Sequence, residues 1–141
     1  MISTFVMNYK KYPPSEIEGV TQKVERRITD ICDRSLYKFT STTLADSTAA
    51  YVDYKQLAKF LSLGWPVKHE YIAKVVAKLS FTLKETIKQL DEMYKQDQVL
   101  KSYYDKWRVS FKQIEPELIE FLIYNSVDLK LYSEELKRLK Q

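Results

Sequence analysis

Hydrophobic positions recur at alternating steps of four and three residues through most of the second half of the chain. The longest run, which we call the seam, lies between residues 72 and 114. Its members are Ile72, Val76, Leu79, Leu83, Thr86, Leu90, Met93, Asp97, Leu100, Tyr104, Trp107, Phe111 and Ile114. All except Thr86 and Asp97 are apolar or amphipathic. A sustained 3.5-residue period is typical of a helical stripe that wraps against other helices with a left-handed twist.

Two arrangements of residues 68–114 fit the seam. Neither Gly nor Pro interrupts its centre, which favours one long helix with at most a kink. The alternative is two antiparallel helices joined by a tight turn near residues 96–98, and the usual length of helices favours such a break. We expect the continuous helix, with Asp97, the one charged residue of the seam, as the best place for a kink or a break.

The N-terminal third predicts an arm followed by a helix. Residues 1–14 have no helical period, and Pro13-Pro14 forces an extended backbone there. Ser15 and Glu18 then form a capping box, from which a helix is expected to run to about Ser35. The Ser-, Thr- and Ala-rich residues 39–50 show no period and are expected to form a loop.

Helix-capping residues, glycine and proline predict where the remaining helices begin and end. A second capping box at Asp53 and Gln56 predicts a short helix that ends at Gly64 with a left-handed cap. Pro66 is expected to be the first residue of the next helix, and Pro116 the first residue of the last one. In that last helix Ser133 offers an alternative cap. The fold is therefore expected to be an all-α bundle of about four main helices, with residues 1–14 as the arm and residues 15–141 as a single helical-bundle domain.

Composition supports one non-membrane domain. A chain of 141 residues that is 45% hydrophobic can build one core. Its two Gly and four Pro leave few turns, which argues against a hairpin-rich β fold. No apolar stretch approaches the roughly 18 residues of a membrane span. The first seven residues lack the features of a signal peptide, so we expect a soluble protein.

The chemical inventory makes an enzyme the weakest class. One His (His69) and one Cys (Cys32) cannot form a His/Cys metal cluster, and two separated Gly cannot build a phosphate-binding loop. His69 is expected to be a solvated first-turn residue and Cys32 a thiol at the edge of the core. Pairs such as Asp91/Glu92 and Glu134/Glu135 read as surface charge. We expect no catalytic residue, no metal and no cofactor.

Basic residues are concentrated in the centre of the chain. Residues 68–114 carry ten Lys or Arg against six Asp or Glu, whereas residues 115–141 carry four against six. At 100° per residue, six lysines fall broadly opposite the seam. These candidates for contact with the backbone of double-stranded DNA are Lys74, Lys78, Lys84, Lys88, Lys95 and Lys106. A solvated helix face or an acidic protein partner fits the same pattern.

Residues 53–79 contain two helices around a Gly-containing turn, as a helix-turn-helix does. The second of these helices lacks Arg, Asn or Gln for reading base edges, and Pro66 lies where a recognition helix should begin. A small helical regulator or inhibitor, binding a host protein or nucleic acid, is the alternative function.

The eleven tyrosines suggest surfaces that are buried by another chain. Several lie outside the seam, and the sequence LIEFLIY, residues 118–124, is apolar almost all round, as in a deep core or a contact between chains. Self-association is therefore expected. The candidate interface residues are Phe5, Tyr9, Tyr12, Phe121, Ile123 and Tyr124.

A Gly-poor, Lys- and Tyr-rich chain of this length, with an arm (MISTFVMNYKKYPP) before a helical bundle, resembles the structural coat proteins of viruses that infect hyperthermophilic archaea, especially the spindle-shaped and two-tailed kinds. The resemblance covers length, composition and organisation. It implies a capsid subunit that polymerises into a virion shell and packs near DNA, in a virion assembled in the host cytoplasm. It assigns no individual functional residue.

Overall fold

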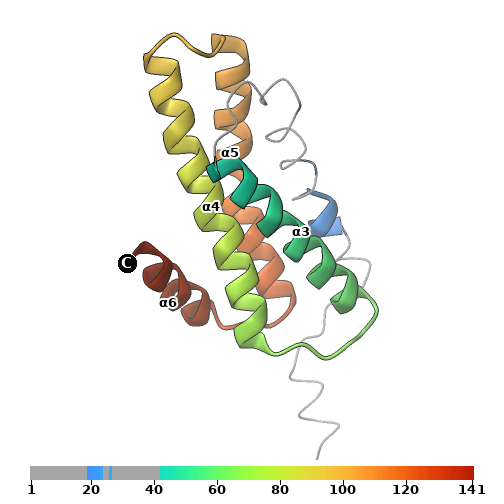
Figure 1. Cartoon of the computed structure of the whole chain (residues 1–141). Helices are drawn as coiled ribbons and strands as arrows, with labels where there is room; N and C mark the ends of the chain where they lie inside the picture. Colours follow the sequence, from blue (N-terminus) through green and yellow to red (C-terminus); the bar gives the residue numbers. More distant parts are fainter. Residues whose placement is uncertain (1–18, 24–25, 27–41) are drawn as a thin grey trace, which may run out of the picture.

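The computed structural model describes residues 19–23, 26 and 42–141, and no strand occurs among them (Figure 1). The expectation of an all-α bundle is confirmed. Its sizeable helices are α3 (Thr42–Ser62), α4 (His69–Lys95), α5 (Lys101–Tyr124) and α6 (Leu129–Lys140). Residues 19–23 and 26 are also helical, within the predicted first helix. The arm, residues 1–14, and Cys32 lie outside the described residues.

Helix α4 is the centre of the bundle, and α3, α5 and α6 each pack against it. In Figure 1, α5 returns antiparallel beside α4, while α6 lies to the left of α4 and most of α3 to its right. Because three helices surround its first half, α4 is buried over much of its circumference there. Ala73 and Ala77, both 1% exposed or less, have small side chains that let neighbouring helices approach closely.

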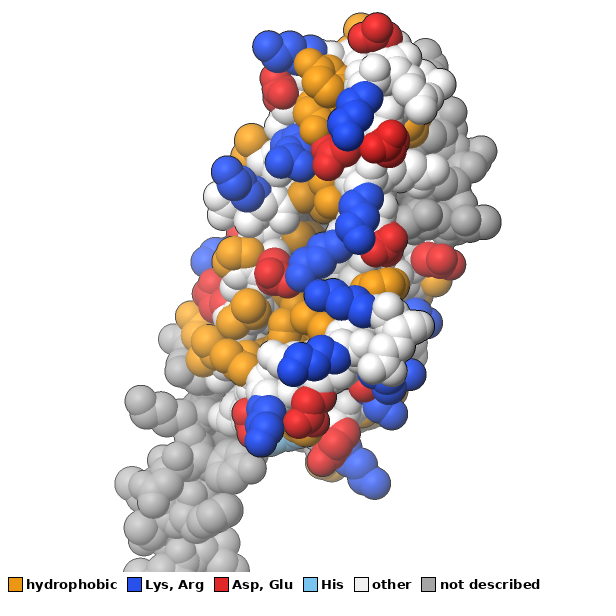
Figure 2. Space-filling model, turned by 90° about the vertical axis from the view of Figure 1, so that its left-hand side faces the viewer, with side chains coloured by type: hydrophobic (Ala, Val, Ile, Leu, Met, Phe, Trp, Pro, Cys, Tyr) orange, Lys and Arg blue, Asp and Glu red, His pale blue; other side chains and the backbone are white. Residues whose placement is uncertain are grey.

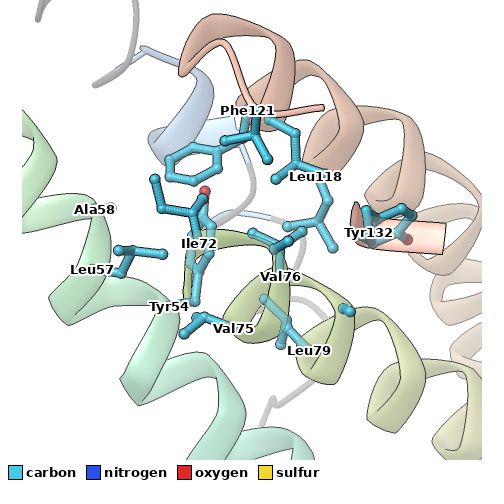
Figure 3. Close-up of a cluster of buried hydrophobic side chains, with 14 of the residues drawn as sticks. Tyr54, Leu57, Ala58, Ile72, Val75, Val76, Leu79, Leu118, Phe121 and Tyr132 are labelled. Atoms are coloured by element: carbon cyan, nitrogen blue, oxygen red, sulfur yellow. The ribbon is translucent and has the colours of Figure 1, made fainter. Parts of the chain in front are cut away.

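One main core joins all the described helices (Figure 3). Tyr54 of α3 packs against Phe121 of α5, with ring centroids 4.9 Å apart and ring planes at 58°. Ile72 of α4 and Tyr132 of α6 belong to the same cluster. Val20 is also buried in it, which ties the N-terminal described segment to the bundle. Burying one such large side chain contributes roughly 1.5–3 kcal/mol.

The expected continuous helix over residues 68–114 is wrong, and the antiparallel alternative describes the structure. The chain reverses at Asp97, whose φ is 54°. The N–H of Gln98 donates to the carbonyl of Met93 over 2.9 Å, and the N–H of Asp97 donates to that of Tyr94 over 3.1 Å. These two bonds form a Schellman motif, which satisfies the last carbonyls of α4.

The spacing of the seam continues through this turn because the first half of the seam, on α4, packs against the second half, on α5. Leu90 of α4 and Trp107 of α5 form a second, smaller core towards the turn end of the hairpin. Partly buried Ile87, Met93, Val99 and Phe111 surround this pair. The apolar side chains of a helix with the four-three spacing can be buried against a separate helix or against the second half of the same seam, folded back as an antiparallel helix. The pattern therefore could not distinguish the two arrangements.

The expected loop over residues 39–50 is also wrong, because α3 begins at Thr42. The small residues of this stretch are what the packing requires. Ser47 is 1% exposed, and its hydroxyl lies 2.9 Å from the hydroxyl of Thr86 on α4. The pair Asp53 and Gln56, read as a capping box, lies in the interior of α3.

Both prolines expected to start helices lie elsewhere. Pro66 precedes α4, which begins at His69 after an extended Lys68. Pro116 lies inside α5, and the break comes instead after Tyr124. Helix α6 is capped by Asp128, whose carboxylate accepts a hydrogen bond from the N–H of Lys130 over 2.9 Å. Ser133, the alternative cap, is interior to α6.

The three turns that connect these helices share one backbone design. Gly64, Asp97 and Ser126 each have a positive φ, of 78°, 54° and 59° respectively. The N–H of Trp65 donates to the carbonyl of Phe60, and the N–H of Val127 donates to that of Leu122. Each turn is thus a Schellman motif. The left-handed cap predicted at Gly64 is confirmed.

Candidate self-association surface

Large apolar side chains are exposed around the turn between α3 and α4. We call this surface the turn patch, and its members are Leu63, Trp65 and Tyr71. Each has more than half of its surface exposed, at 58%, 55% and 52% respectively. The Schellman motif places Trp65 over Phe60, with ring centroids 4.9 Å apart and planes at 13°. The same turn that ends α3 therefore presents an indole to solvent.

A cavity of about 170 Å³ adjoins the turn patch. It is lined by Asp53, Gln56, Leu57 and Phe60 of α3 and by Tyr71 of α4. An apolar cavity of roughly 150 Å³ is large enough to hold a benzene molecule. The cavity beside the turn patch is thus large enough for one aromatic ring.

One acidic side chain lines this cavity, and two others lie near it in the sequence. Asp53 is exposed at its edge, and Asp46 lies seven residues earlier on the same face of α3. Glu70 is exposed next to Tyr71 at the start of α4. None of these three carboxylates forms an ion pair with another described residue. The cavity therefore combines apolar and aromatic side chains with polar ones, of which Asp53 carries a negative charge.

A second exposed apolar site lies at the opposite end of α4. Leu100, which follows α4 and caps α5, is 67% exposed, and Tyr103 in the first turn of α5 is 42% exposed. Since α4 has 27 residues, the two ends are about 40 Å apart. The hairpin thus carries apolar surface at both of its ends.

The six lysines proposed for DNA contact do not form one uninterrupted face. Lys84 forms an ion pair with Glu115, Lys88 pairs with Glu85, and Lys95 pairs with Glu92. Lys106 lies on α5, because the chain reverses at Asp97. Lys74 and Lys78 remain exposed, one turn apart on α4.

Figure 2 shows the face that carries α6, where Lys and Arg side chains lie among Asp and Glu with hydrophobic side chains between them. Lys74 lies near enough to Glu135 of α6 to help lower the pKa of that carboxyl, after the larger effect of Arg138. The face is therefore mixed in charge rather than uniformly basic. The contact with DNA stays a prediction.

The candidate interface residues differ in how deeply they are buried. Phe121 is fully buried in the chain's own core, and Tyr124 is partly buried against that core. Ile123 is 46% exposed. Phe5, Tyr9 and Tyr12 lie outside the described residues. Of the described members, Ile123 offers the most surface to another chain.

Two polar clusters were not found from the sequence. In the first, Lys84, Ser80 and Tyr132 surround the carboxylate of Glu115 where α4, α5 and α6 meet. Burial raises the pKa of Glu115, but Lys84, Tyr132 and Ser80 outweigh it, so the pKa lies below its ordinary value. Burial, with the charge of Glu115, raises the pKa of Tyr132, which stays a neutral hydrogen-bond donor. This cluster joins α4, α5 and α6.

The second cluster lies on the hairpin. The rings of Tyr94 and Tyr104 stack in parallel, with centroids 4.1 Å apart. The Tyr104 hydroxyl donates to Asp91, which also accepts from Arg108 at 3.3 and 3.4 Å. The bond to Asp91, followed by burial, raises the pKa of Tyr104. Asp91, read as free surface charge, instead joins α4 to α5, a pairing visible only once the chain folds back.

The turn patch was also missed, although it has a sequence signal. In the stretch Gly64-Trp65-Pro66 an aromatic residue directly follows a left-handed cap and directly precedes a proline. That position is held outside the helix and is therefore partly exposed unless another element covers it.

In the described part of the chain, no helix combines the length and apolar character that crossing a bilayer requires. Three or more His, Cys, Asp or Glu side chains do not gather as a metal site among the same residues. A scan against protein-family models, a search of curated proteins and a search of solved structures each gave no match to this chain.

Proposed function

We propose that this chain is a non-enzymatic structural subunit that acts by self-assembly, as the coat (major capsid) subunit of a virus particle with basic residues near DNA. The observation that carries the proposal is the exposure of large apolar side chains at both ends of the α4–α5 hairpin. Trp65 and Tyr71 lie at one end and Leu100 at the other. Large apolar side chains gathered on a surface mark sites of contact between chains.

Two separated sites favour a polymer over a discrete complex. If one end of a subunit binds the other end of the next, the contact is head-to-tail and builds rings or open filaments. A regulator that captures one partner needs only one such site. Tyr and Trp, which dominate the turn patch, are also the residues enriched in the contacts that carry most binding energy.

In the same proposal, exposed lysines contact the DNA backbone. Lys74, Lys78 and Lys106 form no ion pair with another described residue, and they supply charge without reading base edges. Binding should therefore be indifferent to sequence and weaken steeply as salt rises.

Light scattering and electron microscopy of the full-length chain at rising concentration, with and without double-stranded DNA, test this proposal. We expect large particles or filaments. The variants Trp65→Ser and Leu100→Ser each remove one of the two surfaces that meet in a head-to-tail contact, so each variant alone should already give monomers. Val109→Ser, at an equally exposed site on α5, is the matched control and should assemble normally.

A full-length protein that stays monomeric at high concentration contradicts assembly. A stoichiometric complex with one host protein, or sequence-specific DNA binding that persists across salt, would instead support the regulator. In the DNA-binding assay, Lys74→Gln with Lys78→Gln should lower the slope of log affinity against log salt by up to about 2.

A further inference from the structure

We propose that the cavity beside the turn patch receives a tyrosine from the segment Tyr9–Tyr12 of a neighbouring copy. The inference rests on the proposed self-assembly and names the acceptor and the donor of one of its contacts. The acceptor is the α3–α4 cavity, and the donor is the N-terminal arm, residues 1–14.

The cavity fits an aromatic ring in volume and in its walls. About 170 Å³ is available between Leu57, Phe60 and Tyr71. Two aromatic side chains among the lining residues allow the tilted or offset ring contacts that aromatic pairs prefer. Gln56 and Asp53 at the edge can accept hydrogen bonds from a phenolic hydroxyl.

The arm carries the complementary charge at the required spacing. Its sequence Tyr-Lys-Lys-Tyr occupies residues 9–12 and is followed by Pro13-Pro14, which favours an extended backbone. In an extended chain residues two apart share a face, about 6.5–7 Å from each other. In an extended segment of this sequence Tyr9 would share a face with Lys11, and Tyr12 with Lys10.

A tyrosine ring in the cavity would place one of these lysines beside the acidic edge. Asp53 is part of the cavity lining, and Asp46 and Glu70 extend the negative charge along α3 and to the start of α4. These carboxylates are open to a basic partner because they make no ion pair with another described residue. Complementary charge of this kind selects the partner and its register.

The donor is assigned to a neighbour because the contact is one of the contacts of the proposed self-assembly. Val20 is buried in the main core, and Lys23 forms an ion pair with Glu120 of α5 over 3.7 Å. The cavity instead lies between α3 and α4.

The binding test uses a synthetic peptide of residues 1–14 and a protein that lacks those residues, with its helix content checked by circular dichroism. Calorimetry should show saturable binding at one site. Replacing Tyr9 and Tyr12 by Ala in the peptide should abolish binding, and Asp53→Lys in the protein should weaken it about tenfold. Asp105→Lys, a charge reversal at an exposed site on α5, should leave the affinity unchanged.

A charge exchange gives a sharper check. A peptide with Lys10→Glu and Lys11→Glu should bind the wild-type cavity poorly and regain affinity for the Asp53→Lys protein. Binding that ignores Asp53→Lys, or no binding at all, overturns the inference.

Mixing experiments separate this contact from the proposed function. Full-length Asp53→Lys protein keeps its arm but has a damaged acceptor, and the arm-deleted protein keeps only the acceptor, so the two should form a mixed complex that neither forms alone through this contact. If full-length wild-type protein assembles but Asp53→Lys leaves particle size and stability unchanged, the cavity contact is wrong and assembly stands. If full-length protein stays monomeric while the peptide binds the arm-deleted form, the contact between neighbours and the assembly are both wrong.

Discussion

The hydroxyl of Tyr132 on α6 donates a hydrogen bond to Glu115 Oε2 on α5, 3.1 Å away, and lies 3.0 Å from Ser80 Oγ on α4. One buried phenol thereby connects three helices. Tyr132, which is 5% exposed, is the one buried residue of α6. Tyr132 thus attaches α6 together with Leu131, Leu136 and Leu139, which pack against the main core.

Replacing Tyr132 by Phe removes this hydroxyl and leaves the ring in place. We expect a loss of about 1–2 kcal/mol in the free energy of unfolding, because a hydrogen bond to a charged carboxylate is lost. Urea denaturation measures it. Tyr71→Phe, at an exposed site, is the matched control and should change stability by less than about 0.5 kcal/mol. Equal effects of the two substitutions would contradict the role of the Tyr132 hydroxyl.

Glu115 predicts a dependence of stability on pH. Its pKa in the folded protein lies below the ordinary value of 4.5, although burial alone would raise it, because Lys84, Tyr132 and Ser80 stabilise the carboxylate. The unfolded chain therefore binds this proton first as pH falls. The contribution of Glu115 is complete above about pH 5 and is lost as pH falls through the folded pKa.

The measurement is the urea midpoint between pH 7 and pH 3 for wild type and for Glu115→Gln. The variant should have a flatter profile below pH 5. Glu134→Gln, an exposed carboxylate on α6, should keep the wild-type profile. A wild-type profile that Glu115→Gln leaves unchanged would show that other carboxylates dominate acid unfolding.

How far the sequence determined the fold is clearest in the seam. The four-three spacing identified buried positions in both halves, such as Leu83 and Ile114, which are 1% and 3% exposed. It could not decide whether the chain reverses at the place named for a break, Asp97, because a folded-back stripe and a straight one bury the same residues. The backbone conformation of Asp97 decided that, and only Asn, Asp and Gly adopt it readily.

The other wrong predictions, a loop over residues 39–50 and a helix start at Pro116, arose from small residues and from a proline. The stretch from Thr42 to Ala50 lacks a large apolar face, yet it is helical because close packing on α4 requires small side chains such as Ser47 and Ala50. Pro116 and Lys112, the residue four earlier, are both exposed in α5. The missing backbone hydrogen bond therefore lies near solvent, where water can replace it.

At the three positions with positive φ, a substitution to glycine and a substitution of glycine by alanine should change the free energy of unfolding in opposite directions. Asp97→Gly and Ser126→Gly should each raise the free energy of unfolding by about 0.5–1 kcal/mol, because glycine adopts a positive φ without strain. Gly64→Ala should lower it by about 1 kcal/mol. An added Cβ at residue 64 meets no atom within 4 Å, so this loss reports backbone strain alone.

Thermal unfolding checks these three variants, and Asp97→Asn is the control. Asn tolerates the left-handed conformation as Asp does but carries no negative charge at the C-terminal end of α4, where such a charge is unfavourable. A gain for Asp97→Asn equal to that of Asp97→Gly would assign the effect to charge and not to φ.

Pro116 offers a second route to higher stability. Pro116→Ala restores an N–H that can donate to the carbonyl of Lys112 inside α5, and it should raise the free energy of unfolding by about 1–2 kcal/mol. Calorimetry on the two proteins measures it. Pro66→Ala, in the connection before α4, restores no helical bond and should be neutral or slightly destabilising. A destabilised Pro116→Ala protein would mean that the proline sets a bend that the core requires.

The reversal at Asp97 also bears on domain swapping, the exchange of α5 between two copies of the chain. The spacing of the seam passes through the turn without a change of phase, so straightening the turn would keep every apolar position on one side of the helix. A second chain could then supply the α5 that the first had lost, in a domain-swapped pair with the same side-chain contacts. Whether two molecules remain separate or exchange α5 therefore depends on the backbone conformation of the short connection at residues 96–100.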